Sequence, residues 1–362
     1  MLTLTSASIV SRKFIRYAVI SIIAIVIIRF TILSGINLYE RFFPDPPPEA
    51  TVKFGKLPAL SLPNNAQSEE DVCRLVYNLE TASGSLPVLY QQTNVYYMPK
   101  PISSIGALEK ANTIARDLGF NSEGRELVET VFLFTKANSP SSLNINIVTR
   151  AFSISYDVNS DPQVFNQIPP QAENAVSAVK GLLGRAGLIN DYKLGPTKTQ
   201  LLRVESGKLV KAISQSEANI VKVNLYREKY GVTQFELPAV TPDPDESNVW
   251  FLMSNSSGNV QIIAGEYHYF PLDKNKFSTY PVKTAEQAFE DLKNCKGGIA
   301  KIGDNYDGEI KIRNVYLAYY DYGQYIEYYQ PVVVFEGEND FVAYVPAVTD
   351  EFYGANQVDQ TK

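Results

Sequence analysis

The chain contains one histidine, His268, in the aromatic run Gly265–Phe270. A Ser–His–Asp triad on an α/β-hydrolase fold needs a G-x-S-x-G turn, and the sequence has none, so we interpret His268 as a structural or surface residue. Ser177 and Lys180 have the S-x-x-K spacing of penicillin-recognising enzymes. The S-D-N and K-T-G elements that complete such a site are missing, so we place both residues on the exposed face of a helix.

The segment Gly303–Gly308 has glycines at the spacing of a phosphate-binding loop but lacks the Lys-Ser/Thr pair that contacts the nucleotide. Asp304, Asp307 and Glu309 would offer the oxygen ligands that calcium prefers, although the EF-hand order is absent. We interpret the segment as a turn. With one His and two Cys in the chain, multi-histidine metal sites and haem cages are excluded. We therefore predict no catalytic residue, no metal and no cofactor.

The two cysteines, Cys73 and Cys295, allow two interpretations. A disulfide between them would close a long loop and stabilise the fold by restricting the unfolded chain. Alternatively, they are two small buried thiols.

Tyrosine is the most unusual residue in the composition, with 23 copies against one tryptophan. Many lie close to the C-terminus, and we select Tyr319, Tyr322, Tyr325 and Tyr328 as candidate partner-binding aromatics, because tyrosine provides a large contact area at little entropic cost. The alternative is that these rings fill a core.

Overall composition indicates a globular protein: the 362 residues are 45% hydrophobic and 20% charged, with a net charge of -6. An acidic protein of this kind is a poor partner for nucleic acid, because phosphates require a basic surface. The length suggests two or three modules.

Residues 17–39 are almost entirely apolar and predict a transmembrane helix, which needs about 20 residues. Arg29 is the one charge within this run, and snorkelling or pairing with another helix would accommodate it. Basic residues in 1–16 place the N-terminus in the cytoplasm and the body outside the cell membrane, as a single-pass protein. A cleaved signal peptide is the alternative.

The rest of the chain divides by composition into a stalk, three units and a tail. Residues 40–70 are rich in proline and predict an extended stalk and linker. Amphipathic helices, each followed by strand-like segments, then predict an α+β fold of about three helix-plus-antiparallel-sheet units, 71–160, 165–275 and 278–350, before a flexible tail, 351–362.

The helices are predicted from apolar stripes and from end signals. The first stripe includes Ile105, Leu108 and Leu118. Gly119, Gly187 and Gly297 are predicted C-terminal caps, and Thr284 with Gln287 predicts a capping box. The predicted strands are 126–135, 143–150, 152–157, 201–204, 220–226, 249–254, 261–270, 309–321, 325–336 and 341–348.

The final unit carries a resemblance to a known family. The segments Tyr280–Phe289, Val315–Tyr319, Gln330–Phe335 and Phe341–Val345 are similar to the helix, strand, "PV-x-F" strand and last strand of PepSY-like extracytoplasmic modules, as found in membrane-anchored regulators of the Gram-positive cell-wall sensor kinase. This resemblance implies a non-enzymatic role through protein contacts and brings no catalytic residue with it.

Taken together, the sequence predicts a non-enzymatic, membrane-anchored extracytoplasmic protein of the cell envelope, with the lipid bilayer as one partner through residues 17–39. It is expected to bind or regulate another envelope protein. One alternative is a cell-wall or glycan-binding module that uses the tyrosines. Another is a hydrolase that uses paired carboxylates alone.

Overall fold

The computed structural model describes most of the chain, in two compact units, Met1–Glu49 and Ala50–Lys362. The residues it describes are 17, 21–32, 35, 49–64, 74–231, 236–256, 259–305 and 308–355.

In the first unit, residues 21–32 are helical and Arg29 is exposed. No helix among the described residues is long and apolar enough to cross a membrane, because a crossing needs about 20 helical residues. The prediction of a transmembrane helix at 17–39 is therefore wrong, and so are the single-pass topology and the placement in the cell membrane that depended on it. Residues 18–20, 33–34 and 36–39 of that range lie outside the described residues, and the lipid bilayer as a partner stays a prediction. Residues 1–16 and part of the predicted stalk lie outside the described residues.

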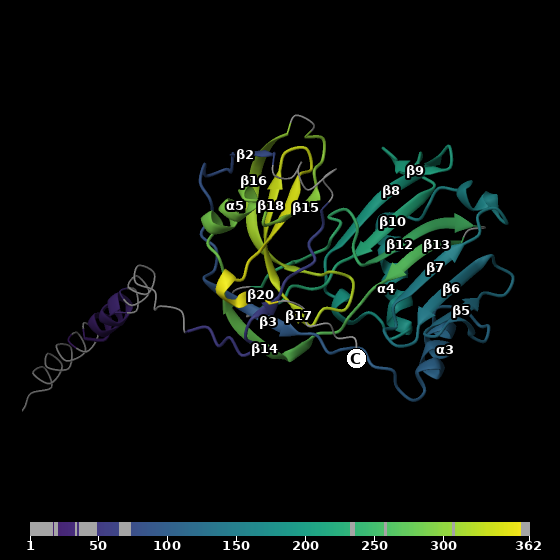
Figure 1. Ribbon diagram of the computed structural model, residues 1–362, viewed down its shortest axis with the longest axis horizontal. Coiled ribbons are helices and arrows are strands. Elements are labelled where there is room, and N and C mark those ends of the chain that lie inside the picture. The colour runs from purple at the N-terminus through teal and green to yellow at the C-terminus, as the bar shows by residue number, and fades with distance from the viewer. Residues whose placement is uncertain are drawn as a thin grey trace, which may run out of the picture. The chain divides into compact units, whose positions relative to one another are not determined.

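The largest element of the second unit is a nine-stranded antiparallel sheet (Figure 1). Its strands, in spatial order, are β4 (Arg125–Val128), β5 (Val131–Thr135), β6 (Ser141–Asn146), β7 (Phe152–Tyr156), β13 (Asn259–Tyr267), β12 (Val249–Ser256), β10 (Ile220–Leu225), β8 (Thr197–Glu205) and β9 (Lys208–Lys211).

Two of the predicted units share this sheet. The strands β7 and β13 pair from Phe152–Tyr267 to Ser155–Ala264, which joins the strands of 71–160 to those of 165–275. Pairing removes two exposed sheet edges at once. The prediction of about three separate helix-plus-sheet units is therefore wrong, and the chain is mostly β-structure arranged in several sheets.

Two helices, α3 (Ala107–Asp117) and α4 (Ala172–Arg185), pack on one face of the nine-stranded sheet. Both are short and rich in alanine, so their stability comes from this packing. On the opposite face, the 3₁₀ turn η1 (Pro162–Phe165) covers a smaller cluster.

The predicted stripe of the first helix is partly wrong. Ile105 is fully exposed and Leu108 is 37% exposed, whereas Leu118 is buried. The helix begins only at Ala107, because Gly106 has a left-handed conformation with φ of 79°. Ile105 consequently lies outside the helix that was expected to turn it inward.

A six-stranded sheet forms the second core, with α5 (Ala285–Lys293) packed against it. Its strands are β11 (Ala239–Val240), β16 (Glu309–Tyr320), β18 (Pro331–Gly337), β19 (Val342–Pro346) and β15 (Gly298–Lys301), with β2 (Val76–Leu79) paired to β16. Both β2 and β11 come from outside 278–350 and run parallel to β16.

Two smaller sheets and two 3₁₀ turns complete the unit. One sheet contains β14 (Asp273–Pro281), β3 (Gln92–Tyr97) and β17 (Tyr328–Tyr329), and the other contains β1 (Leu57–Pro58) and β20 (Tyr353–Ala355). Strand β20 lies inside the predicted tail, and 356–362 lie outside the described residues. The turns are η2 (Asn190–Tyr192) and η3 (Asp350–Phe352).

Candidate functional site

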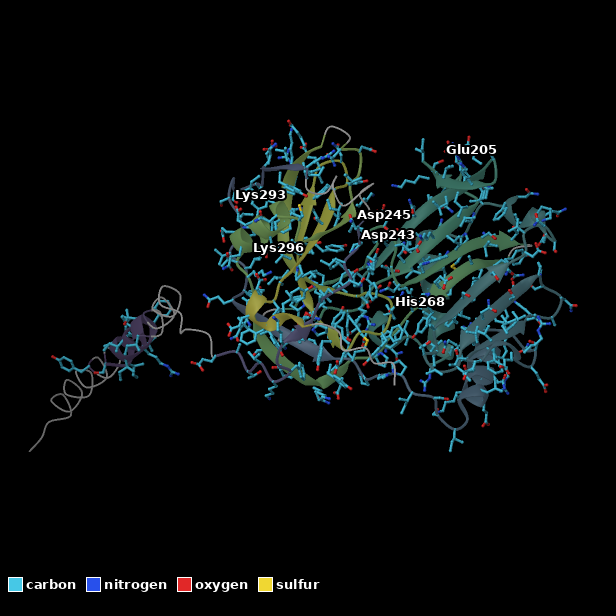
Figure 2. The ribbon with its side chains drawn as sticks, viewed as in Figure 1. Glu205, Asp243, Asp245, His268, Lys293 and Lys296 are labelled. Carbon is cyan, nitrogen blue, oxygen red and sulfur yellow. The ribbon has the colours of Figure 1, made fainter. Side chains whose placement is uncertain are left out.

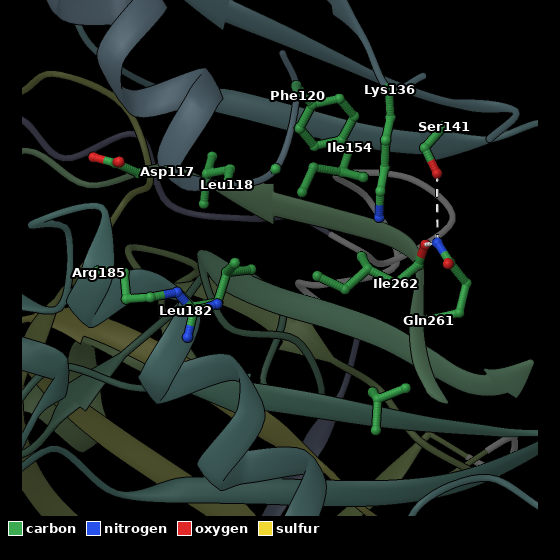
Figure 3. A pocket seen from close by; sticks show the side chains of 12 residues that line it. Asp117, Leu118, Phe120, Lys136, Ser141, Ile154, Leu182, Arg185, Gln261 and Ile262 are labelled. Carbon is green, nitrogen blue, oxygen red and sulfur yellow. Dashed lines mark hydrogen bonds between the residues drawn. The ribbon is translucent and has the colours of Figure 1, made fainter. Parts of the chain in front are cut away.

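A pocket of about 300 Å³ lies where the C-terminal ends of α3 and α4 approach β7 and β13. We call it the α3–α4 pocket. It is shown in Figure 3. Its apolar lining consists of Leu118, Phe120, Ile154, Leu182, Val260 and Ile262.

Both helices end in a way that shapes the pocket. Gly119 has a left-handed conformation with φ of 93°, and the amide of Phe120 donates to the carbonyl oxygen of Ala115 at 2.8 Å. Gly187 has φ of 68° and is followed by Leu188, whose amide donates to Leu183 at 2.7 Å. In this type of helix end, the left-handed residue turns the chain and the next apolar side chain packs back on the helix.

Two cations border the pocket. Figure 3 shows the ammonium group of Lys136 pointing towards Ile262, with the guanidinium group of Arg185 on another wall. Within the described part of the chain, neither cation has a carboxylate partner. Asp117 also borders the pocket, but its carboxylate points away from the other labelled side chains.

The one hydroxyl group of the lining belongs to Ser141. Its Oγ lies 3.1 Å from Oγ of Ser139 and accepts from Nε2 of Gln261 at 3.4 Å. A serine nucleophile needs an adjacent base that takes its proton, and neither a hydroxyl group nor an amide has that basicity. Neither of these two hydrogen-bond partners can therefore activate Ser141.

A second polar cluster lies deeper, around the fully buried Arg227. Its Nε donates to Oδ2 of Asp321 at 2.8 Å, and its Nη2 donates to the carbonyl oxygen of Phe270 at 2.9 Å. Nη1 lies 3.5 Å from Oδ2 of Asp191, and the guanidinium group lies 4.6 Å from the ring centre of Tyr269. Arg227 lies two residues after the buried end of β10 and was not singled out from the sequence.

The protonation of this cluster follows from its burial. Burial by itself lowers the pKa of Arg227, but Asp321 and the surrounding tyrosines raise it well above its ordinary value, so the group stays charged. Burial raises the pKa of Tyr230, and Asp191, which accepts its hydroxyl hydrogen bond, raises it further. A buried charge is tolerated only when it is paired, and Arg227 pairs with Asp321 and Asp191, although its Nη1 donates no hydrogen bond among the described residues. We interpret the cluster as structural.

The structure places the four selected tyrosines differently from one another. Tyr319 is fully buried, and its ring stacks on Tyr329 at 4.9 Å between centroids. Tyr322, Tyr325 and Tyr328 are partly exposed. A continuous adhesive face would need all four rings at the surface, so the buried Tyr319 cannot contribute to one.

The other candidate residues are not brought together. Cys295 takes part in a disulfide, and its predicted partner, Cys73, lies outside the described residues. Nε2 of His268 lies 2.9 Å from Oε2 of Glu266. In Figure 2, His268 is remote from the labelled Lys293 and Lys296.

Two remaining patterns have ordinary positions in the fold. Ser177 is exposed on α4, and Lys180 donates to the carbonyl oxygen of Lys193 at 3.1 Å. Among the described residues, no group of His, Cys, Asp or Glu is arranged to hold a metal ion. Asp307, one of the three carboxylates considered for calcium, lies outside the described residues.

Comparison with known proteins does not assign this chain to a family. No protein-family model matches the chain, and no curated protein matches it. A solved structure of an uncharacterised protein from Eubacterium rectale ATCC 33656 covers 77% of this chain and 91% of its own, at 11% sequence identity and a TM-score of 0.39. Similarity at that level supports no conclusion about the fold or function of this chain. The resemblance to PepSY-like modules stays a prediction.

Proposed function

We propose that this protein is a non-enzymatic binding protein and that the α3–α4 pocket receives part of another protein. The observation that carries the proposal is the pocket itself, which combines an apolar floor with polar groups at its border. Small pockets of this type hold the anchor side chains of a partner, where burial of a few groups supplies most of the binding energy.

The pocket also has the rigidity that recognition requires. Its floor belongs to strands inside a nine-stranded sheet, and its walls are helix ends closed by hydrogen bonds. Val260 on β13 is 44% exposed, so a partner can reach the lining without opening the fold. Surfaces held by regular elements lose little conformational entropy when they bind.

Site-specific photocrosslinking in living cells of the source organism tests this proposal. Val260 is replaced by a photoreactive phenylalanine derivative in the full-length chain. The control position is Leu209 on the edge strand β9, which is 47% exposed and remote in the sheet order. We expect one discrete crosslinked protein from position 260 that position 209 does not capture.

Leu182→Glu places a charge on the apolar lining and should abolish that crosslink while the fold is retained, as checked by circular dichroism. Identical crosslinks from positions 260 and 209, or none from position 260, would contradict the proposal.

A further inference from the structure

We propose that the α3–α4 pocket selects an anionic group attached to an apolar body. This inference rests on the proposed function and adds the chemistry of the part that enters the pocket. The apolar floor provides the surface for the body, and the two border cations provide the site for the anion.

The balance of charge favours an anion. Lys136 and Arg185 each carry a full positive charge, and neither is neutralised by a carboxylate within the described residues. Asp117 is the one opposing full charge of the lining, and its carboxylate is directed away from the pocket centre (Figure 3). An ion pair formed beside an apolar wall is screened less than one in open water.

The helix ends oppose this preference only weakly. A helix C-terminus carries roughly half a negative charge, spread over its free carbonyl groups. In α3, two of those groups are already occupied, because Phe120 and Gly119 donate to Ala115 and Arg116 at 2.8 and 2.9 Å. The two whole positive charges of the exposed Lys136 and Arg185 outweigh these partial charges at the pocket mouth.

The size of the pocket limits the ligand. A volume of about 300 Å³ is at the lower end of the range for small-molecule sites. It accommodates a short aliphatic or single aromatic body with its charged group at the rim. In a protein partner, an acidic residue next to a large apolar residue, or a C-terminal apolar residue, has this chemistry.

The test uses three probes with the same eight-carbon chain: octanoate, octanol and octylammonium. Binding to the full-length protein is measured by isothermal titration calorimetry at low salt. We expect octanoate to bind about tenfold more tightly than octanol, since hydrogen bonds to charged groups are the strong ones. Octylammonium should bind most weakly.

Variants separate the contributions of floor and border. Lys136→Ser and Arg185→Gln should each weaken octanoate binding about three- to tenfold and leave octanol binding unchanged. Arg116→Gln is the matched control, because Arg116 is also an exposed basic residue in the last turn of a helix but does not line the pocket. Lys136→Glu should shift the preference towards octylammonium.

A pair of peptides identifies the source of the anion: acetyl-Leu-Glu-Phe-amide and its Gln counterpart. Preference for the Glu peptide assigns the anion to a protein partner. If octanoate shows the charge preference and the peptides are bound equally, the anion is a small molecule, and the protein partner of the proposed function is contradicted.

Two other outcomes overturn one proposal each. In the first, octanoate and octanol bind equally, and the pocket-filling Val260→Trp abolishes this binding while Leu209→Trp does not. That result would overturn the anion preference and leave the binding function in place. If none of the probes or peptides binds in a way that Val260→Trp blocks, the proposed function itself fails.

Discussion

At the residue scale, the most informative charged group outside the pocket is Asp291. It is almost fully buried on α5, and its two carboxylate oxygens pair with Lys283 at 2.7 Å and Lys296 at 3.0 Å. Burial alone raises the pKa of Asp291, but the hydrogen bonds from Lys283 and Lys296 exceed that effect and hold the pKa below its usual range.

The sign of the resulting pH dependence follows from this lowered pKa. A carboxylate whose pKa is lower in the folded than in the unfolded state stabilises the fold at pH values above its unfolded pKa of about 3.9. That contribution is lost as the pH falls through the folded pKa.

Asp291→Asn removes the carboxylate and should lower the free energy of unfolding by about 1–3 kcal/mol at pH 7. The difference from the wild type should stay constant between about pH 5 and 8 and shrink below about pH 4. Urea denaturation followed by circular dichroism over a pH series measures it. Glu123→Gln, at an exposed loop residue, is the control and should show no such trend, and a constant difference down to the lowest pH would contradict the assignment.

At the scale of elements, glycine signals predict two of the three helix C-terminal ends. The glycine caps at Gly119 and Gly187 are confirmed. The third predicted cap is wrong, because Cys295 rather than Gly297 has the left-handed conformation, with φ of 61°. The amide of the next residue, Lys296, donates to Asp291 at 2.9 Å, which closes the helix with a non-glycine residue in the strained position.

The capping box at the start of α5 is also confirmed. The amide of Gln287 donates to Oγ1 of Thr284 at 3.2 Å, and the amide of Thr284 donates to Oε1 of Gln287 at 2.9 Å. We expect Thr284→Ala to destabilise the protein by about 1 kcal/mol. Gln171→Ala is a matched control at the N-cap of α4, whose side chain makes no capping bond, and it should change stability little. Equal effects of the two changes in chemical denaturation would show that the capping box does not contribute.

Strand positions follow from alternation, but turns within a strand-like run do not. The run 126–135 was expected as one strand and forms the hairpin of β4 and β5, with a bulge between Glu126 and Val128. The run 325–336 contains the short β17 before β18. In both cases the local residues are compatible with a continuous strand, and pairing with neighbours decides where it breaks.

At the scale of the whole second unit, a few buried contacts connect the nine-stranded sheet to the six-stranded sheet. Arg227, two residues after β10, pairs with Asp321, directly after β16. Nδ2 of Asn248 donates to the carbonyl oxygen of the same Asp321 at 2.7 Å. The segment between β10 and β12 also adds β11 to the six-stranded sheet.

Arg227→Met would leave Asp191 and Asp321 buried without their shared cation. Removal of one partner from a buried ion pair costs about 3–5 kcal/mol. We expect a loss of this size in urea denaturation, together with faster hydrogen exchange in β10 and β16. Arg203→Met is the matched control: Arg203 pairs with Glu205 at 2.9 Å, and the two side chains are 40% and 58% exposed. Ion pairs at the surface contribute about 0–1 kcal/mol. A loss at Arg227 no larger than that at Arg203 would contradict the structural role.

The sequence alone determines the features that depend on neighbouring residues. These are the helices α3, α4 and α5, two glycine caps, one capping box and most strand positions. The arrangement of those strands does not follow from local pattern, because any half-buried strand can pair with any other. The pairing of β7 with β13 merged two expected units into one sheet.

The candidate site illustrates the same division. The turn beside Lys136 and the apolar face of α4 could be predicted, but the pocket requires two helix ends, three strands and that turn to meet. Residues from Asp117 to Ile262 line it, and no local signal relates them. Likewise, Arg227 reads as an ordinary basic residue in the sequence, and only its burial between Asp191 and Asp321 gives it a structural role.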